Sequence, residues 1–123
     1  MGDLSKDFSR KEYECRCGCG FNTVDVELVK VMQDLRDYYD KKIIITSGNR
    51  CFAHNLNTPG ATKDSLHQDG KANDFIVDGV PAFEVFKYLN DKYPAKYGIG
   101  LYSCPFSRVH LDVRPYRARW RME

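Results

Sequence analysis

Hydrophobic residues recur with a helical period between residues 24 and 40. Seven apolar positions share one stripe: Val24, Leu28, Val31, Met32, Leu35, Tyr38 and Tyr39. Asp and Lys residues lie between them, so the pattern predicts an amphipathic helix whose stripe is buried in the core. We expect Thr23 to be its N-cap, with Asp25 and Glu27 in the first turn.

The rest of the pattern predicts a second helix and four strands. The helix has Pro81 at its first position, runs to about Tyr93, and buries Val85, Phe86 and Leu89. Alternating or β-branched runs predict strands at residues 42–47, 71–77, 97–102 and 108–113. Two helices and four short strands are typical of a small α+β domain with a mainly antiparallel sheet.

Two further segments lack a regular pattern, namely an irregular opening over residues 8–22 and a long loop over residues 49–69. Long loops in small domains usually carry function. The length of 123 residues predicts a single domain over residues 1–123. Hydrophobic residues make up 42% and charged residues 29%, which excludes a disordered chain. No apolar run approaches the roughly 20 residues that span a bilayer, so we expect no membrane partner.

Charge is concentrated at one end of the chain. Residues 108–123 hold five arginines against Asp112 and Glu123, although the whole chain has a net charge of only +2. This segment is either a solvated tail or a binder of an anionic polymer such as nucleic acid or bacterial cell wall. Only Tyr116 and Trp120 accompany the arginines, which disfavours stacking on nucleic acid, so we expect no nucleic-acid partner. Trp120 is expected to pack against the sheet.

The chain has three histidines, two of which suggest a metal site. The long loop delivers His67, and the strand after it brings back Asp74. In the last predicted strand, alternation places His110 and Asp112 on the same face. Two imidazoles and one carboxylate would leave zinc an open position for water, which is the catalytic arrangement. From spacing alone, however, a surface histidine with an ordinary hydrogen bond is the simpler interpretation.

Motifs in order along the chain strengthen the metal hypothesis. They are Ser47-Gly48-Asn49-Arg50, His54-Asn55, Ser65-x-His67-x-x-Gly70-x-Ala72-x-Asp74, Val109-His110-x-Asp112 and Ala118-Arg119-Trp120, together with a Cys-rich opening from Phe8 to Gly20. This set resembles the zinc D-Ala-D-Ala carboxypeptidase family, peptidase family M15, and most of all its short phage and prophage branch. The resemblance implies the small α+β fold shared with the Hedgehog signalling domain.

The resemblance also implies roles for individual residues. The zinc ligands would be His67, Asp74 and His110. Arg50 would bind the substrate carboxylate or scissile carbonyl and stabilise the oxyanion, unless it forms only a surface salt bridge. Ser65 would hydrogen-bond to the substrate or fix the loop; its alternative is a plain turn residue.

The general base is the weak point of the resemblance. Several family members place an acidic residue three positions before the last histidine ligand, and here that position is Ser107. Asp112 is the nearest remaining carboxylate, so we expect it to be either the base or a group that orients a ligand or an arginine. His54 is a further candidate for a polar role, although packing within the loop beside Asn55 is the simpler interpretation.

Five cysteines are many for a chain of this size. Cys15, Cys17, Cys19 and Cys51 could bind a second, structural metal ion, since thiolates are preferred in closed zinc sites. Cys-x-Cys-x-Cys is not the usual zinc knuckle, so a disulfide or free buried thiols stay as alternatives. Cys104 has no evident partner in the sequence.

The leading functional hypothesis is a monomeric zinc peptidase that acts on peptidoglycan stem peptides, as a D-Ala-D-Ala carboxypeptidase or as an endolysin-type endopeptidase. The alternative is a catalytically inactive zinc-containing module that binds cell wall, which Ser107 favours. A zinc-stapled nucleic-acid binder is a third and weaker reading. The first seven residues lack the pattern of a signal peptide. We therefore expect synthesis in the cytoplasm and action on the wall after phage-type release or as part of a virion.

Overall fold

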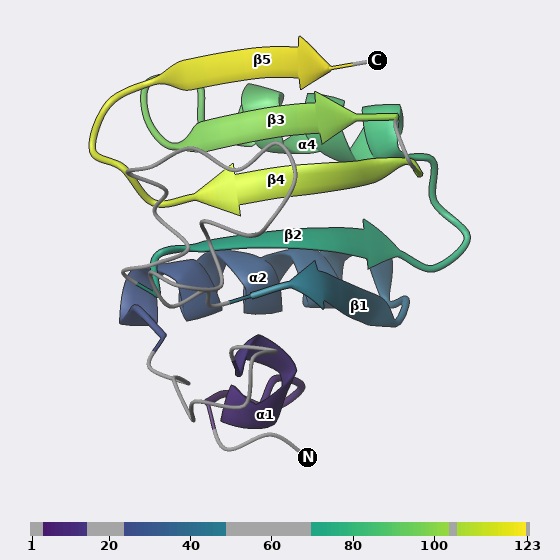
Figure 1. Cartoon of the computed structure of the whole chain (residues 1–123), viewed down its shortest axis with the longest axis vertical. Helices are drawn as coiled ribbons and strands as arrows, with labels where there is room; N and C mark the ends of the chain where they lie inside the picture. Colours follow the sequence, from purple (N-terminus) through teal and green to yellow (C-terminus); the bar gives the residue numbers. More distant parts are fainter. Residues whose placement is uncertain (1–3, 15–23, 49–69, 104–105, 123) are drawn as a thin grey trace.

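A five-stranded sheet is the centre of the fold (Figure 1). The computed structural model describes residues 4–14, 24–48, 70–103 and 106–122. The strands are β1 (Ile43–Ser47), β2 (Ala72–Val77), β3 (Gly98–Tyr102), β4 (Arg108–Asp112) and β5 (Ala118–Met122), in the spatial order β1-β2-β4-β3-β5. All neighbours are antiparallel except β3 and β5, which are parallel. The predicted α+β class with a mainly antiparallel sheet is confirmed.

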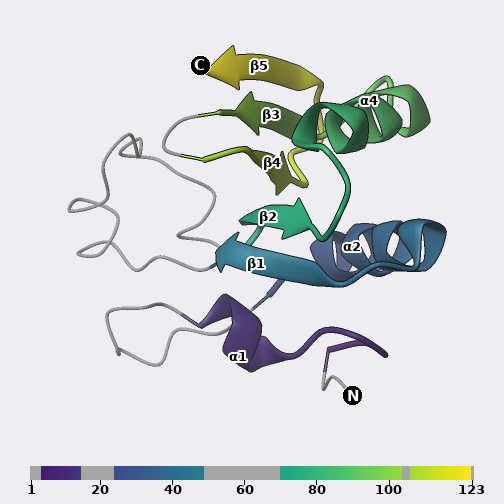
Figure 2. The same cartoon turned by 90° about the vertical axis from the view of Figure 1, so that its right-hand side faces the viewer.

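Helices α2 (Val26–Tyr39) and α4 (Ala82–Lys92) cover one face of this sheet (Figure 2). The core lies between them and the sheet, and its fully buried members include Leu28, Met32, Leu35, Phe75, Leu89, Ile99, Val109 and Leu111. We call the opposite face, away from these helices, the site face. No helix in the described part of the chain is long and apolar enough to cross a membrane.

The helix ends differ from the prediction by one or two residues. Asp25 is the N-cap of α2, because its carboxylate accepts a 2.8 Å hydrogen bond from the Glu27 amide; the predicted cap, Thr23, lies outside the described residues. Pro81 is the N-cap of α4 and not its first residue. Tyr38, expected in the buried stripe, is 61% exposed.

Two segments have more regular structure than predicted. Residues Arg10–Tyr13 form the short helix α1 within the opening that was expected to be irregular, and a capping box between Ser9 and Glu12 begins it. For the arginine-rich end, a solvated tail was one of two interpretations, and it does not hold for residues 118–122. They form β5, whose residue Arg119 donates to the carbonyls of Tyr93 and Tyr97.

Candidate metal centre

One row of residues crosses the whole sheet at the level of the predicted site. The register pairs Ser47 with Asp74, Asp74 with His110, His110 with Gly100, and Gly100 with Trp120. A register shift between Ile45 and Ser47 brings β1 into this row, and such bulges are common beside active sites. The row therefore gathers an acid, a histidine and an aromatic ring from three strands, β2, β4 and β5.

The His110 ring lies between two carboxylates. Its Nδ1 is 2.9 Å from Asp74 Oδ1, and its Nε2 is 2.8 Å from Asp112 Oδ2. The histidine is only 8% exposed. Burial lowers the pKa of His110, but the hydrogen bonds to Asp112 and Asp74 outweigh burial and raise the pKa above the ordinary value. Without metal, the site thus favours an imidazolium that donates one hydrogen bond to each acid.

Asp112 is buried and accepts hydrogen bonds from His110, Arg114 and Gly98. Arg114 donates to it twice, from Nε to Oδ1 and from Nη2 to Oδ2, each at 2.7 Å. The backbone amides of Gly98 and Arg114 donate to Oδ1 at 3.1 and 3.2 Å. Burial raises the pKa of Asp112, but the hydrogen bonds from His110 and Arg114 prevail and hold the pKa well below the ordinary range. An acid held in this way stays ionised and is poorly suited to accept a proton.

Two glycines of β3 make room for this arrangement. A Cβ atom at Gly98 would collide with the Asp112 carboxylate, and a Cβ atom at Gly100 would collide with the Trp120 indole. Both glycines are on the site face, opposite Asp112 and His110 respectively in the register. The Gly-x-Gly of this strand is therefore a spatial requirement of the site.

Trp120 covers His110 from the edge of the sheet. The ring centroids are 5.0 Å apart and tilted by 47°. The indole Nε1 donates to the Tyr102 hydroxyl at 2.7 Å, and the Arg114 guanidinium lies 5.4 Å from the indole centroid. The expectation that Trp120 packs against the sheet is confirmed, and its place on the imidazole adds a contact that the sequence did not reveal.

Asp74 and His110 offer two donor atoms of the types that zinc binds. A carboxylate oxygen and an imidazole nitrogen that already lie 2.9 Å apart are a donor pair suited to zinc. In the described ranges, no cluster of three or more His, Cys, Asp or Glu residues is placed to hold a metal. The predicted third ligand, His67, lies outside those ranges, as do Arg50, His54, Ser65, Cys15, Cys17, Cys19, Cys51 and Cys104.

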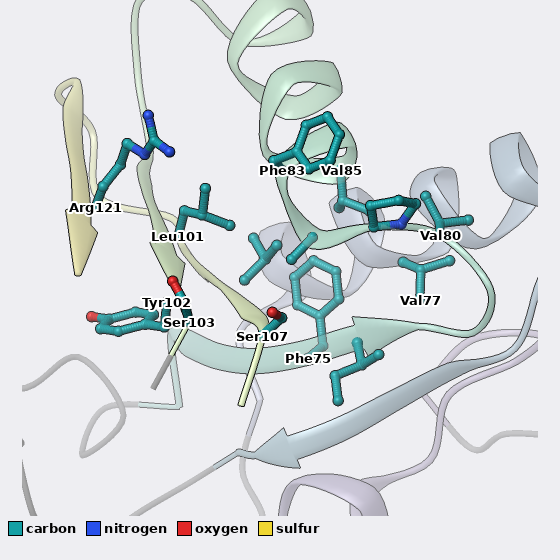
Figure 3. A pocket seen from close by; sticks show the side chains of 14 residues that line it. Phe75, Val77, Val80, Phe83, Val85, Leu101, Tyr102, Ser103, Ser107 and Arg121 are labelled. Carbon is teal, nitrogen blue, oxygen red and sulfur yellow. The ribbon is translucent and has the colours of Figure 1, made fainter. Parts of the chain in front are cut away.

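Ser107 lines a different part of the molecule. It borders a cavity of about 360 Å³ together with Phe75, Val85 and Leu101, beside α4 (Figure 3). Phe75 and Val85 are core residues of the helix-covered face. This cavity is therefore lined by residues other than the Asp74–His110–Asp112 group.

The sequence reasoning singled out Asp74, His110 and Asp112 but missed Arg114 and Gly98. Arg114 follows Asp112 by two residues, so alternation gave a signal that the two share a face. Gly98 and Gly100 also alternate in phase with each other. The sequence alone does not show that they pair with Asp112 and His110 of β4, because this depends on the register of the two strands.

A comparison with protein families finds a match over residues 6–112 to the family model described as Peptidase M15. A search among curated proteins finds no match. The matched range includes Asp74, His110 and Asp112, and it ends before Arg114 and β5.

Proposed function

Because the chain belongs to the peptidase M15 family, we propose that it is a zinc-dependent hydrolase that cleaves peptidoglycan stem peptides. The observation that carries the proposal is the pair of potential ligands, Asp74 Oδ1 and His110 Nδ1, which lie 2.9 Å apart. His67 would complete the set. Zinc bound there would supply a Lewis acid for the scissile carbonyl and an activated water as nucleophile.

We assign Asp112 to the orientation of His110, the second of the two roles considered for it. In histidine metal sites the nitrogen that does not bind the metal commonly donates to a carboxylate. His110 Nε2 lies 2.8 Å from Asp112 Oδ2, so Nδ1 is directed toward Asp74 and the metal. Arg114 and the Gly98 amide hold that carboxylate in place.

Arg50 and Ser65 keep the roles that the family resemblance implies. Arg50 would bind the substrate carboxylate or the developing oxyanion, and Ser65 would hydrogen-bond to substrate or fix its loop. A cysteine-bound structural ion at Cys15, Cys17, Cys19 and Cys51 remains a separate proposal. The bond would be either the terminal D-Ala-D-Ala bond or one within the stem or cross-bridge, and the place of action is the bacterial wall.

A second candidate function is a metal-containing cell-wall-binding module without activity. It is favoured by Ser107 at the position where the family resemblance implies an acid in several members, and by the five hydrogen bonds that engage the Asp112 carboxylate. Neither residue is suited to accept the proton of an attacking water.

One experiment distinguishes the zinc peptidase from the inactive cell-wall-binding module. Purified protein is incubated with defined muropeptides, with and without a zinc chelator, and the products are read by mass spectrometry. Loss of a terminal D-Ala identifies a carboxypeptidase, and a cut stem or bridge identifies an endopeptidase. A protein that sediments with purified wall but yields no chelator-sensitive product is the binding module.

A further inference from the structure

Tyr97 has an unusual backbone conformation for its residue type. Its φ is +71°, in the left-handed region, and it directly precedes β3. That region is sterically unfavourable for a residue with a large side chain, so the surroundings must offset its cost. Among the described residues, Asp40 is the only other non-glycine residue with a positive φ, and it is the C-cap of α2. A helix end is a common place for this conformation, whereas Tyr97 lies beyond the C-cap of α4, Tyr93.

The left-handed backbone at Tyr97 directs two successive amides to the same side. In an extended strand, successive N–H groups point to opposite sides. Here the Tyr97 amide donates to the Arg114 carbonyl at 3.2 Å. The next amide, that of Gly98, donates to Asp112 Oδ1 at 3.1 Å. Both acceptors lie at the C-terminal end of β4 or just beyond it. An extended backbone at Tyr97 would turn the Gly98 amide away from Asp112, so this donor depends on the left-handed conformation.

Contacts on both sides of Tyr97 hold this conformation. The residue is only 3% exposed. Its hydroxyl donates at 2.6 Å to Oε2 of Glu27, in the first turn of α2. Its ring makes an edge-to-face contact with the Tyr93 ring, with centroids 5.0 Å apart. Its carbonyl accepts a 3.0 Å hydrogen bond from the amide of Ala118, the first residue of β5. The side chain is therefore fixed to the helices and the backbone to the sheet.

We propose that Tyr97 is a positioning residue of the metal centre, whose side chain keeps its backbone in the conformation that directs the Gly98 amide to Asp112. Asp112 also accepts the hydrogen bond from His110 Nε2, so two hydrogen bonds connect the Gly98 amide to a proposed ligand. The proposal rests on the proposed zinc site. It makes the bond between Tyr97 and Glu27, on the helix side of the sheet, a determinant of metal affinity.

The test separates the backbone conformation of residue 97 from the loss of its side chain. Tyr97→Ala and Tyr97→Gly both remove the ring and its hydroxyl, and they differ by one methyl group. Glycine enters the left-handed region without steric cost, whereas alanine disfavours it. Tyr97→Phe keeps the ring and removes only the hydrogen bond to Glu27, so it disturbs the core least.

Tyr88→Ala and Tyr88→Phe are the matched controls. The Tyr88 hydroxyl also donates to an acid of α2, Asp34 Oδ2, at 3.3 Å, but the backbone of Tyr88 lies within α4. Substitution there removes a similar contact between a tyrosine and α2 without changing the backbone before β3. Both controls should therefore leave the Gly98 amide and the zinc affinity unchanged.

Two quantities are measured on full-length protein, and neither depends on cleavage. The first is the hydrogen-exchange protection of the Gly98 amide in zinc-free protein, followed by NMR. It is expressed relative to the remaining amides of β3, which corrects for changes in overall stability. The second is the zinc dissociation constant, measured by competition with a chromophoric chelator.

Tyr97→Ala should lower the protection of the Gly98 amide and raise the zinc dissociation constant, each about 5- to 30-fold. This is the factor that corresponds to the preference of an L-residue against the left-handed region, about 5- to 30-fold in an equilibrium constant. Tyr97→Gly should stay within about 3-fold of wild type, because glycine has no such preference. Tyr97→Phe should change both quantities about 2- to 5-fold, as expected for one lost hydrogen bond.

The proposal is overturned if Tyr97→Ala and Tyr97→Gly, both shown folded by circular dichroism, have equal Gly98 protection and equal zinc affinity. If these truncations do not fold, the comparison passes to Tyr97→Phe, and values equal to those of wild type and Tyr88→Phe overturn it. A change in Gly98 protection without a change in zinc affinity also overturns it.

Failure of the proposed function gives a different result. If Tyr97→Ala and Tyr97→Gly differ as expected but wild type with bound zinc cleaves no muropeptide, Tyr97 keeps its role and the peptidase function fails. If zinc-dependent cleavage occurs and the two variants behave alike, the function stands and the role of Tyr97 is refuted.

Discussion

Arg114 and Asp112 form a bidentate ion pair, in which each carboxylate oxygen accepts a 2.7 Å hydrogen bond from a guanidinium nitrogen. The Asp112 side chain is completely buried, whereas Arg114 is partly exposed. A buried acid needs such a partner, because an unpaired charge in the interior is costly. The pair keeps Asp112 ionised, so that its carboxylate can accept a hydrogen bond from His110 Nε2.

Replacing Arg114 should weaken metal binding through Asp112, the carboxylate that Arg114 holds. In Arg114→Ala the buried Asp112 charge loses its main partner, so the free energy of unfolding should fall by about 3 kcal/mol. The zinc dissociation constant should rise about 10- to 100-fold, because His110 is less well oriented. Urea denaturation and competition with a chromophoric chelator measure the two effects. The control Arg117→Ala should change stability by less than about 0.5 kcal/mol, and equal behaviour of the two variants would refute the role of Arg114.

Asp112→Asn distinguishes orientation from proton transfer. If Asp112 orients His110, the variant should bind zinc about 10- to 100-fold more weakly, and saturating zinc should restore much of its turnover. A general base predicts the opposite pattern, with unchanged zinc affinity and turnover that stays absent at saturating zinc. The measurement is kcat as a function of free zinc, and the second pattern would return Asp112 to the role of base.

Gly98→Ala should disturb the site from the neighbouring strand. Its new Cβ would collide with the Asp112 carboxylate, which we expect to cost about 1–3 kcal/mol of stability and to weaken zinc binding. Gly79→Ala is the matched control, because Gly79 has a positive φ of 77° but nothing within contact distance of an added Cβ. It should lose about 1–2 kcal/mol through backbone strain alone, with zinc affinity preserved. Unchanged zinc affinity in Gly98→Ala would show that the close approach of Gly98 to Asp112 does not matter for metal binding.

Metal removal should be visible in the fluorescence of Trp120. The indole is the only one in the chain and lies 5.0 Å from the His110 ring. Exchange of a metal for a proton on that imidazole alters the charge beside the indole, so a chelator should change the emission and added zinc should reverse the change. In His110→Ala the same treatment should leave the emission unaltered. A response of equal size in that variant would place the metal elsewhere.

The parts of the site that follow from local periodicity were predictable from sequence. Alternation in residues 108–113 placed His110 and Asp112 on one face and Val109 and Leu111 in the core, and the structure agrees. The strand that carries Asp74 was also recognised, because its β-branched and aromatic residues are typical of a buried strand.

The features that depend on pairing between distant segments were not predictable. Strand β5 is rich in arginine and lacks a clear apolar alternation, and it is defined by its parallel pairing with β3. The row from Ser47 to Trp120 likewise depends on a register shift in β1 and on the strand order. The spacing of two residues between Asp112 and Arg114 indicated only weakly that they interact. The ion pair matters because Asp112 is buried in the folded sheet, which the sequence alone does not show.

Asp74 and His110 are proposed to bind the zinc ion on which peptide cleavage depends. The most direct measurement is a zinc titration into chelator-stripped protein, with cleavage of a defined muropeptide followed by mass spectrometry. Product formation should be absent in the stripped protein and rise to a plateau as zinc is added. Asp74→Asn should require far more zinc or never respond. Equal cleavage by stripped and zinc-loaded protein, or a normal response of Asp74→Asn, would contradict the account.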